Sequence, residues 1–436
     1  MNVVEHSSEP AIRSEADLFS YPPTDATVDH SFFSEYKPTV NIRDSDTKIE
    51  FRIVGNSNQY LDFNQSFLYC VVKVVNEDGT KLGKDVNVGT TNLLLHSLFS
   101  QCDVFVSNEL VSTTNNCYAY KAYMETMLSH GTDYLDTQGM CAMYFQDTDG
   151  GSISANNEGL VKRKNAIANS QPVELVGKLK FDLANQHRYI LNDTNVVISL
   201  TRQTDRFCLK TWTKPADPPI IPKLQFLDAS FFVCKQALYP SLIIAHQRFL
   251  ETQNAKYPAK KTGVKFFMIP NGNSTFIEEN MFNGRKLPER IVLGLVPSKA
   301  FNGDYGENPF QFLDYGLSYL ALSVNGFPTP MKPLTLNFQK QQSLLPYYML
   351  FSGLGIANQD HGLPINFDEF KNGSTLFAFN LRPQGLAETP LALQKDGSVK
   401  LELNFKKPIS QALHCVVYYE ETQILEIDKY RKVIQH

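Results

Sequence analysis

The stretch YLALSVNGFPTP, residues 319–330, and the stretch QCDVFVSNELVS, residues 101–112, decide the fold. In each of them, apolar and polar side chains alternate on either side of a two-residue turn, which in the first is Asn325-Gly326. Alternation with a period of two predicts a half-buried strand. Asn-Gly between two such runs predicts a tight hairpin, because both residues tolerate positive φ. We therefore expect a β-hairpin at both places.

The two hairpins begin two copies of one series of elements. The first copy runs from about Asp103 to Leu200 and the second from about Tyr319 to Leu403, an offset of roughly 200 to 217 residues. A helix is expected after the first hairpin, because apolar side chains over 120–128 recur at the spacing of one helical stripe. A similar apolar run follows the second hairpin and ends near glycines, which favour helix termination.

Two alternating strands are expected after each helix. The segment KLKFDL, residues 178–183, is matched by TLFAFNL, residues 375–381, and the runs that end at Leu200 and Leu403 alternate in the same way. The two series match in pattern and order with little identity. Two similar β domains in one chain make a pseudo-twofold building block, which is an architectural device more often than a catalytic one.

Length and composition agree with two β domains. The chain has 436 residues, and a single hydrophobic core rarely grows beyond about 250. It contains 30 Phe and 20 Tyr, residues that favour strands. About eight strands per half, separated by turn signals, predict a mainly all-β chain of two tandem eight-stranded jelly rolls, with a few short helices in loops. A seven-stranded immunoglobulin-like sandwich fits less well.

Changes in composition suggest five segments. We expect an extended N-terminal arm at 1–46, a first jelly roll at 47–240, a linking helix at 241–258, a second jelly roll at 259–428 and a C-terminal tail at 429–436. The arm has prolines and scattered aromatic residues without a clear period. It is interpreted either as a segment that docks on a neighbouring subunit, anchored by Phe32, Phe33 and Tyr36, or as a partly ordered tail.

Charge and cysteine content exclude several classes of protein. The net charge is −4, and the first fifty residues hold ten acidic and four basic side chains, so no basic arm for binding a genome is present. Seven cysteines, an odd number without a CxxC pair, indicate reduced thiols in a protein made in the cytosol or nucleus. The N-terminus lacks the basic and apolar regions of a secretory signal, so secretion is not expected.

Motifs for catalysis are missing. The sequence contains no GxGxxG, no phosphate-binding GxxxxGK[ST] and no HExxH. Ser352 precedes a glycine but lacks the glycine two residues earlier that a nucleophile elbow requires, and a helix end explains it better. We therefore expect no enzyme activity, no catalytic residue, no cofactor and no metal ligand.

Three weaker candidates have structural explanations. Asp147 and Asp149 begin a segment like a calcium loop, but the glycine comes too early, and a solvated turn is preferred. Glu420 and its neighbour Glu421 would point to opposite faces of a strand, so they cannot pair as acid and base. His96 and His414 lie in apolar runs and are interpreted as buried structural histidines.

Two basic clusters are interpreted as solvated surface, with contact to packaged DNA or an acidic partner as the alternative. The first basic cluster consists of Lys162, Arg163 and Lys164. The second basic cluster consists of Lys256, Lys260, Lys261 and Lys265. The first lies in the polar segment 145–166, which is expected to be a surface loop. A second surface loop is expected at 211–223, which is rich in proline.

Several longer strings resemble one family. They are ADLFSYPPTDATVDHSFFSEYKP at 16–38, LLLHSLFSQCDVFVSNELVS at 93–112, YAYKAYMETMLSHGTDY at 118–134, AFNGDYGENPFQFLDYGLSYLALSVNG at 300–326 and STLFAFNL at 374–381. These strings are similar to the major capsid protein of Polinton/Maverick-type elements and adintovirus-like viruses. The resemblance covers nearly the whole chain, from about Glu15 onward.

The resemblance implies a double jelly roll whose homotrimer is a pseudo-hexagonal capsomer. Such capsomers would tile an icosahedral shell around double-stranded DNA, with a penton or minor capsid protein at the vertices and only weak or indirect contact with the DNA. The protein would be located in the virion, after synthesis in the host cytoplasm and assembly in the host cell, with the nucleus as a candidate place of assembly. At this length the outer loops are expected to be short.

Residues that fill the two cores are predicted from the alternation. They are Val104, Val106, Phe181, Leu322, Val324 and Phe379. Two other functions stay open on sequence grounds. One is a monomeric jelly-roll binding protein or domesticated host copy, and the other is a minor capsid or penton protein, although one jelly roll would need only half this chain.

Overall fold

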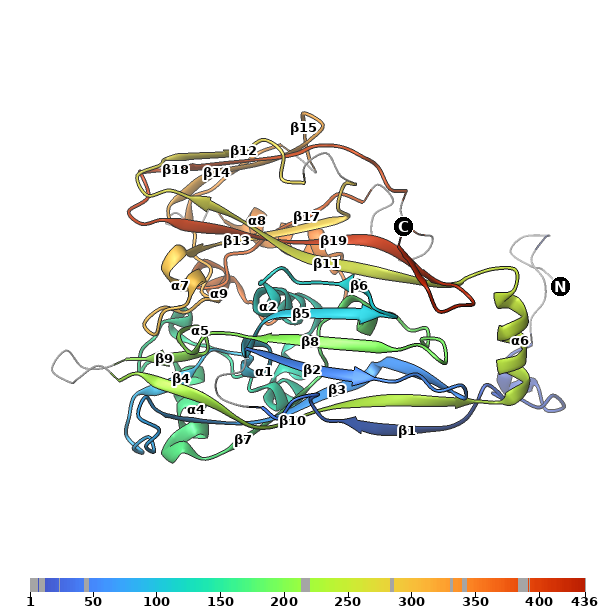
Figure 1. Cartoon of the computed structure of the whole chain (residues 1–436). Coiled ribbons are helices and arrows are strands. Elements are labelled where there is room, and N and C mark those ends of the chain that lie inside the picture. Colours follow the sequence, from blue (N-terminus) through green and yellow to red (C-terminus); the bar gives the residue numbers. More distant parts are fainter. Residues whose placement is uncertain are drawn as a thin grey trace.

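The computed structural model describes residues 7, 12–22, 24–42, 47–212, 220–282, 286–329, 332–338, 343–382, 391 and 393–435. Figure 1 shows two β-sandwiches, one above the other, which we call the first roll (lower) and the second roll (upper). Helix α6 (Pro240–Leu250) joins them at the end of the molecule where the N-terminal segment also lies.

The first roll consists of two four-stranded antiparallel sheets. One has the order β1 (Val28–Tyr36), β10 (Pro222–Leu238), β3 (Gln59–Asn76) and β7 (Val173–Gly177). The other has the order β2 (Lys48–Ile53), β8 (Val196–Arg202), β5 (Phe99–Val106) and β6 (Glu109–Ser112). A small ladder of β4 (Val88–Thr90) and β9 (Leu209–Thr211) lies beside them.

The second roll repeats this arrangement. One sheet has the order β11 (Ala255–Ile269), β19 (Leu413–Ile427), β13 (Arg290–Pro297) and β17 (Phe377–Asn380), and β20 (Val433–Gln435) pairs with β19. The other has the order β12 (Thr275–Glu278), β18 (Val399–Phe405), β14 (Leu317–Val324) and β15 (Phe327–Pro328), and β16 (Leu334–Thr335) pairs with β14.

The two rolls have the same topology. In each, the first, last, third and sixth of the eight main strands form one sheet, and the second, seventh, fourth and fifth form the other. This is the jelly-roll order, in which strands distant in sequence lie side by side. The duplication and the fold class predicted from the sequence are therefore confirmed.

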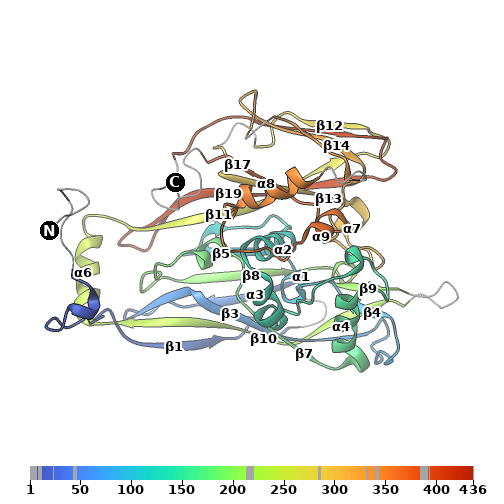
Figure 2. The same cartoon turned by 180° about the vertical axis from the view of Figure 1, so that it is seen from behind.

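Short helices occupy the connections and gather on one side of the rolls (Figure 2). The α-helices are α1 (Leu94–Ser97), α2 (Tyr118–Ser129), α3 (Thr132–Thr137), α4 (Glu158–Ile167), α5 (Asp205–Cys208), α7 (Ser298–Asn302), α8 (Leu344–Leu354) and α9 (Phe367–Lys371). Single 3₁₀ turns lie at Ser14–Ala16, Gln138–Ala142, Asp149–Gly151, Ala168–Ser170 and Asp182–Asn185.

Both predicted hairpins are present. Ser107 and Asn108 have φ of 50° and 70°, and Asn325 and Gly326 have φ of 52° and 83°. Consecutive positive φ values match the right-handed twist of the flanking strands. The helices expected after the hairpins are α2 and α8, and Gly355 ends α8 in the left-handed conformation.

One predicted strand is wrong. Residues 178–183 continue beyond β7 without joining the ladder, and they run into the 3₁₀ turn at Asp182–Asn185. The backbone N–H of Lys180 donates instead to the hydroxyl of Tyr118 in α2 (3.2 Å). The apolar alternation still reports burial, since Phe181 is 1% exposed, but the backbone partners come from a helix that the local pattern does not show.

Three segment boundaries differ in secondary structure from the sequence-based expectation. Residues 28–36, expected in the arm, form β1 and pair with β10 from Val28↔Leu238 to Tyr36↔Phe231. Strand β11 begins at Ala255, inside the segment expected to be the linking helix, and the tail contributes β20. The partners of β1 and β11 are remote in sequence, whereas β20 pairs with the end of the neighbouring strand β19. The domain boundaries themselves stay a prediction, and 213–219 of the proline-rich loop lie outside the described residues.

The predicted core residues fill the two sandwiches. Five of them, Val104, Val106, Phe181, Leu322 and Phe379, are at most 3% exposed. Val324 is half-buried and packs at the edge of the core, because it is the last residue of β14 before the turn. Burial therefore follows the period-2 pattern, as expected for strands covered on one face.

Replacing Phe181 or Phe379 with Ala is expected to lower the free energy of unfolding by about 3–5 kcal/mol, because a buried ring leaves a cavity. Urea titration followed by circular dichroism measures this loss. Phe327→Ala is the control, since that ring is 74% exposed and its loss should cost less than about 0.5 kcal/mol. A loss below about 1 kcal/mol in both core variants would contradict the core assignment.

Candidate functional site: the contact between the two rolls

Helix α2 lies between the rolls and packs against β5 of the first and β11 of the second. The sequence predicts one apolar stripe, yet every side chain from Tyr118 to Leu128 is buried. The stripe pattern is incomplete because the helix is covered on more than one side, so its polar residues must find partners inside the protein. Lys121 and Glu125 are the two charged residues in this position.

Lys121 forms a buried ion pair with Asp182. Its Nζ lies 2.8 Å from Asp182 Oδ1, and the side chains are 1% and 6% exposed. The carboxylate of Asp182 also accepts from Ser112 Oγ (3.0 Å) and from the backbone N–H of Thr262 in β11 (3.2 Å). Burial opposes the charge of Lys121, but the carboxylates of Asp182 and Glu125 outweigh it and raise the pKa of the lysine.

Aromatic rings extend this contact around other sides of α2. Tyr123 stacks on Phe310 with ring centroids 4.1 Å apart, and Tyr120 stacks on Phe301 at 5.2 Å. Both phenylalanines lie in the connection between β13 and β14, and Phe301 belongs to α7 within it. Offset stacked pairs of this kind add stability beyond the burial of area. The connection therefore belongs to the core between the rolls.

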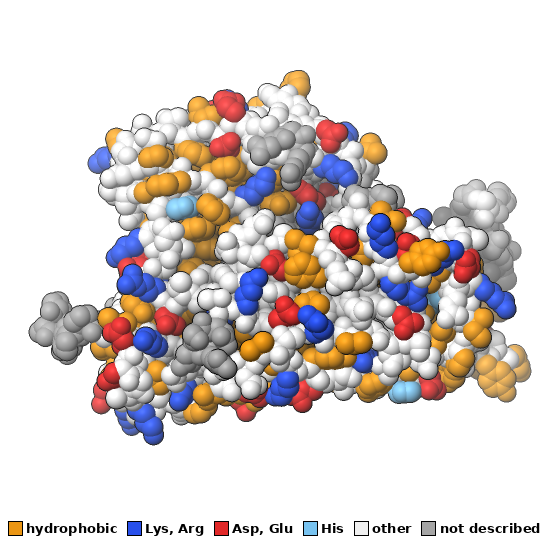
Figure 3. Space-filling view, viewed as in Figure 1, with side chains coloured by type: hydrophobic (Ala, Val, Ile, Leu, Met, Phe, Trp, Pro, Cys, Tyr) orange, Lys and Arg blue, Asp and Glu red, His pale blue; other side chains and the backbone are white. Residues whose placement is uncertain are grey.

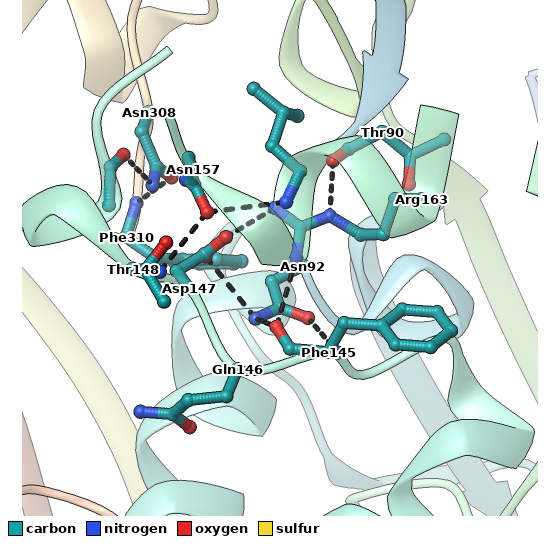
Figure 4. A network of polar contacts seen from close by, with 12 residues as sticks. Thr90, Asn92, Phe145, Gln146, Asp147, Thr148, Asn157, Arg163, Asn308 and Phe310 are labelled. Atoms are coloured by element: carbon teal, nitrogen blue, oxygen red, sulfur yellow. Dashed lines mark hydrogen bonds and ion pairs between the residues drawn. The ribbon is translucent and has the colours of Figure 1, made fainter. Parts of the chain in front are cut away.

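A second polar network lies in the first roll and is shown in Figure 4. Arg163 Nη2 lies 2.6 Å from Asp147 Oδ1, while Arg163 Nε and Nη1 donate to the carbonyls of Thr90 (2.8 Å) and Phe145 (3.0 Å). Asn92 Nδ2 donates to the same carbonyl of Phe145 (2.8 Å). One guanidinium thus holds three segments of the first roll together, which suits its planar set of donors.

This network corrects two predictions. Arg163 is 2% exposed and does not belong to a solvated basic cluster, although Lys162 and Lys164 beside it are not fully buried. The segment expected to be a surface loop contains α4, whose first turn is capped by the side chain of Asn157. A cap followed by buried residues at Leu160, Arg163 and Ile167 was the available signal. It was hidden because Arg counts as polar in a hydrophobic pattern.

The segment 146–151 then reaches the second roll. Asn308 Nδ2 donates to the carbonyl of Gly151 (2.8 Å), and Gln311 Nε2 donates to that of Gly150 (2.7 Å). Gly150 has φ of 62°, and a Cβ there would lie 2.1 Å from the carbonyl oxygen of Asn372. Only glycine allows this approach between backbones.

The acidic residues that resemble a calcium loop have protein partners. Asp147 accepts from Arg163, and Asp149 Oδ2 accepts from Ser152 Oγ (2.6 Å) and Ser154 Oγ (3.0 Å). These two hydrogen bonds, from Ser152 first and Ser154 second, lower the pKa of Asp149. In the part of the chain that the structure describes, no group of three His, Cys, Asp or Glu side chains is arranged to hold a metal ion.

Glu420 lies beside Arg290 and beside Lys260 of the second basic cluster. Glu420 accepts two bonds from Arg290 Nη1 (3.0 and 3.1 Å), and Lys260 lies 3.7 Å from it. Lys265, on β11, stands 4.5 Å above the ring of Phe282. Lys260, Arg290 and Glu420 line a cleft of 920 Å³ between the rolls that also includes Lys178, Lys180 and Glu125, so its charge is mixed.

The remaining candidates have structural positions. His96 Nδ1 lies 3.0 Å from the hydroxyl of Tyr118, and burial lowers the pKa of His96 to about 3. The ring of His414 stacks on Phe301 at 4.3 Å, and burial lowers its pKa as well. Ser352 lies at the end of α8, where its carbonyl accepts from Gly355 N (3.2 Å). Six cysteines are buried and Cys141 is exposed, all with free thiols.

Sequence reasoning missed Lys210. Its Nζ is buried and donates to the carbonyls of Arg206 (3.0 Å) and of Asp304 in the second roll (2.8 Å). Burial lowers the pKa of Lys210 to about 7. A single lysine in a strand carries no signal of burial, so this contact could not be inferred from the pattern.

No family model matches the sequence. An uncharacterized protein of Caenorhabditis elegans is 26% identical over 396 residues, covering 88% of this chain and 92% of that protein.

Solved structures share the arrangement of both rolls. A chain of the Sputnik virophage matches with a TM-score of 0.63 and 11% identity over 100% of this chain and 94% of its own. The protein with the sequence printed above has the same double jelly-roll fold. The major capsid proteins of Faustovirus (TM-score 0.56, 9% identity, 97% and 93% covered) and of mavirus (0.54, 10%, 100% and 96%) also match. These neighbours are double jelly-roll capsid proteins of virophages and large DNA viruses.

No helix in the described part of this double jelly roll has both the length and the apolar character needed to cross a membrane.

Asp182→Asn is expected to destabilise the double jelly roll by about 3–5 kcal/mol, because it leaves Lys121 buried beside a neutral group. The control is Asp228→Asn, which removes an ion pair with Lys37 (2.9 Å) whose side chains are 54% and 45% exposed. That change should cost at most about 1 kcal/mol. Urea unfolding at neutral pH compares the two, and equal losses would contradict the role of Asp182.

His96 is expected to make the double jelly roll less stable in mild acid. Its folded pKa, about 3, lies below the ordinary 6.5, so the unfolded chain takes up the proton first. This contribution is complete above pH 6.5 and is lost as pH falls toward 3, at about 1.4 kcal/mol per pH unit.

Urea unfolding near pH 7 and pH 5 measures this effect. The protein should lose about 2 kcal/mol more than the variant His96→Gln over this interval. The difference between the two proteins isolates His96 from the other histidines. If both lose the same amount, His96 is not the group that titrates.

Proposed function

We propose that this chain is the major capsid protein of an icosahedral double-stranded DNA virus or virus-like element, of the Polinton/Maverick and adintovirus-like kind. Three copies would form a pseudo-hexameric capsomer, and capsomers would join with a penton or minor capsid protein in the virion. The likeness to viral capsid proteins over the whole chain supports a role in a shell, and the family-like strings support the narrower assignment.

One observation supports the proposed trimer. Helices α2 and α8 occupy the same place in their rolls, after the hairpin and beside the sixth strand or its continuation. The second roll covers α2, whereas no roll packs on α8 in the same way among the described residues. Leu344, Leu345 and Tyr348 on α8 are accordingly 61%, 48% and 51% exposed. An apolar helix surface of this kind marks a contact with another molecule.

The opposite side of the molecule carries a matching surface. Strand β1 is the first-roll counterpart of β11, which covers α2. On its sheet, Phe33 (51% exposed) lies 5.5 Å from the ring of Phe67, which stacks on Phe232 at 5.1 Å. We infer that this aromatic cluster faces α8 of the next copy.

Repetition of the contact leads to a ring. The contact between the rolls joins two different surfaces, and such a head-to-tail contact closes into a ring when its rotation allows. Two rolls per chain then let three chains fill six positions. The wide contact inside the chain, with its buried charges, supports a fixed angle between neighbouring rolls.

The distribution of charge supports a shell rather than a coat on nucleic acid. The net charge is −4, and on the face in Figure 3 the Lys and Arg side chains are interspersed with Asp and Glu. Proteins that cover DNA by themselves need a continuous basic surface. Contact with the packaged DNA would therefore be weak or indirect.

Light scattering is expected to give a mass of three times the 49.3 kDa chain. Leu345→Asp with Tyr348→Asp should shift the mass to that of one chain, because a charge in a dry contact has no partner. Tyr430→Asp, at a side chain that is 79% exposed, is the control and should leave the trimer intact.

Negative-stain imaging of the same samples would show hexagonal particles or shells. A wild-type protein that stays a single chain across salt and concentration would contradict the proposal. It would favour a monomeric jelly-roll binding protein or a domesticated host copy. A trimer unaffected by the α8 substitutions would place the interface elsewhere.

A further inference from the structure

Residues 12–22 of the N-terminal arm expose large apolar side chains. Ile12, Leu18, Phe19 and Tyr21 are 77%, 78%, 94% and 96% exposed. Four such side chains within eleven residues form an apolar surface that their own chain leaves in water. Large exposed apolar side chains gathered in one short segment indicate a contact site in soluble proteins. The arm therefore resembles a binding segment that is not bound to a site in its own chain.

Helix α6 and the arm lie at the same end of the molecule (Figures 1 and 2), and an apolar groove lies beside α6. It has a volume of 460 Å³ between α6, the start of β11 and the segment before β8. Its apolar walls are formed by Leu191, Leu238, Leu242, Phe249 and Leu250. Although it belongs to α6, the side chain of Phe249 is 59% exposed.

The charges of the groove and of the arm are opposite. The exposed side chains of Arg188 and Lys256 lie at the groove, and Arg188 Nη1 donates to the carbonyl of Lys256 at 2.6 Å. The arm carries exposed carboxylates at Glu15 and Asp17 and one exposed cation, Arg13, so its charge is net negative. A segment with apolar side chains and acidic neighbours complements an apolar groove with a basic edge.

The arm does not fill the groove of its own chain. Thr27 lines the groove, and its carbonyl accepts from the backbone N–H of Tyr239 (3.3 Å), so the arm starts beside the site. Beyond this point it leads away, and Leu18 to Tyr21 stay in solvent. An extended arm reaches about 3.3 Å per residue, so residues 12–26 span roughly 45–50 Å, enough to reach a neighbouring molecule.

We propose that the arm, residues 12–22, docks in the α6 groove of a second copy of this chain. Leu18 and Phe19 would enter the groove beside Leu242 and Phe249, and the arm carboxylates would approach Arg188 and Lys256. This inference rests on the proposed self-assembly, to which it adds a strap between copies. Arm and groove lie at the same end of the molecule, so copies that stand side by side present both at one level.

Disulfide trapping tests the docking in the full-length protein. Cys141→Ser removes the exposed thiol. In that background, a chain with Phe19→Cys is mixed with a chain with Phe249→Cys, dissociated and reassembled, and oxidised gently. Non-reducing electrophoresis is expected to show a disulfide-linked pair. The matched control replaces Phe249→Cys by Phe327→Cys, which is also exposed at 74% and should give at least tenfold less linked pair.

A chain that carries both Phe19→Cys and Phe249→Cys distinguishes the two modes of docking. Links between chains support the strap. A link found only within single chains shows that the arm folds back on its own groove, and this overturns the proposal. Light scattering on the same samples separates the two hypotheses. A trimer without cross-links overturns the strap alone, whereas a single-chain mass overturns both the strap and the proposed capsomer.

Charge reversal provides a second test that introduces no cysteine. Arg188→Glu with Lys256→Glu should raise at least tenfold the protein concentration below which the assembly dissociates. Adding Glu15→Lys and Asp17→Lys to the same chain should restore the original value, since the charges are again opposite. No loss on the first change, or no recovery on the second, would contradict the pairing of arm and groove.

Discussion

The carboxylate of Asp182 joins three parts of this chain. It accepts from Lys121 on α2, from Ser112 at the end of β6 and from the backbone of Thr262 on β11. The first two belong to the first roll and the third to the second, so one buried group ties the rolls to the helix between them. A buried charge is tolerated only where its partners are fixed in place. The orientation of the two rolls therefore depends on this interaction.

Other groups fix the contact between the rolls in the same way, with different chemistry. Arg163 gathers backbone carbonyls of the first roll, and the glycine segment that follows Asp147 reaches Asn308 and Gln311 of the second. Around these polar centres, stacked rings exclude water. Apolar surface provides most of the free energy of such a contact, but it does not set an angle. Directed hydrogen bonds do, and a ring of rolls needs one angle at every contact.

Duplication explains why a wide, dry contact exists inside a single chain. Two copies of one sandwich have the same surfaces, so the surface that receives the second roll recurs on the second roll itself. There it meets solvent, and α8 carries the exposed apolar residues that α2 buries. The exposed arm and the groove beside α6 extend the same pattern to the end of the molecule. An unfilled surface in the free chain is what the proposed assembly requires.

The sequence by itself determined the duplication, both hairpins, the helices after them and the buried residues of the alternating strands. These features follow from local rules. A period of two places Val104 or Leu322 on the buried face of its strand, whichever strand pairs with it. The tertiary structure decided the rest. It placed 28–36 in a sheet with β10, turned 178–183 away from the ladder toward α2, and buried Arg163, Lys121 and Lys210. Their burial depends on partners distant in sequence, and local periodicity holds no information about them.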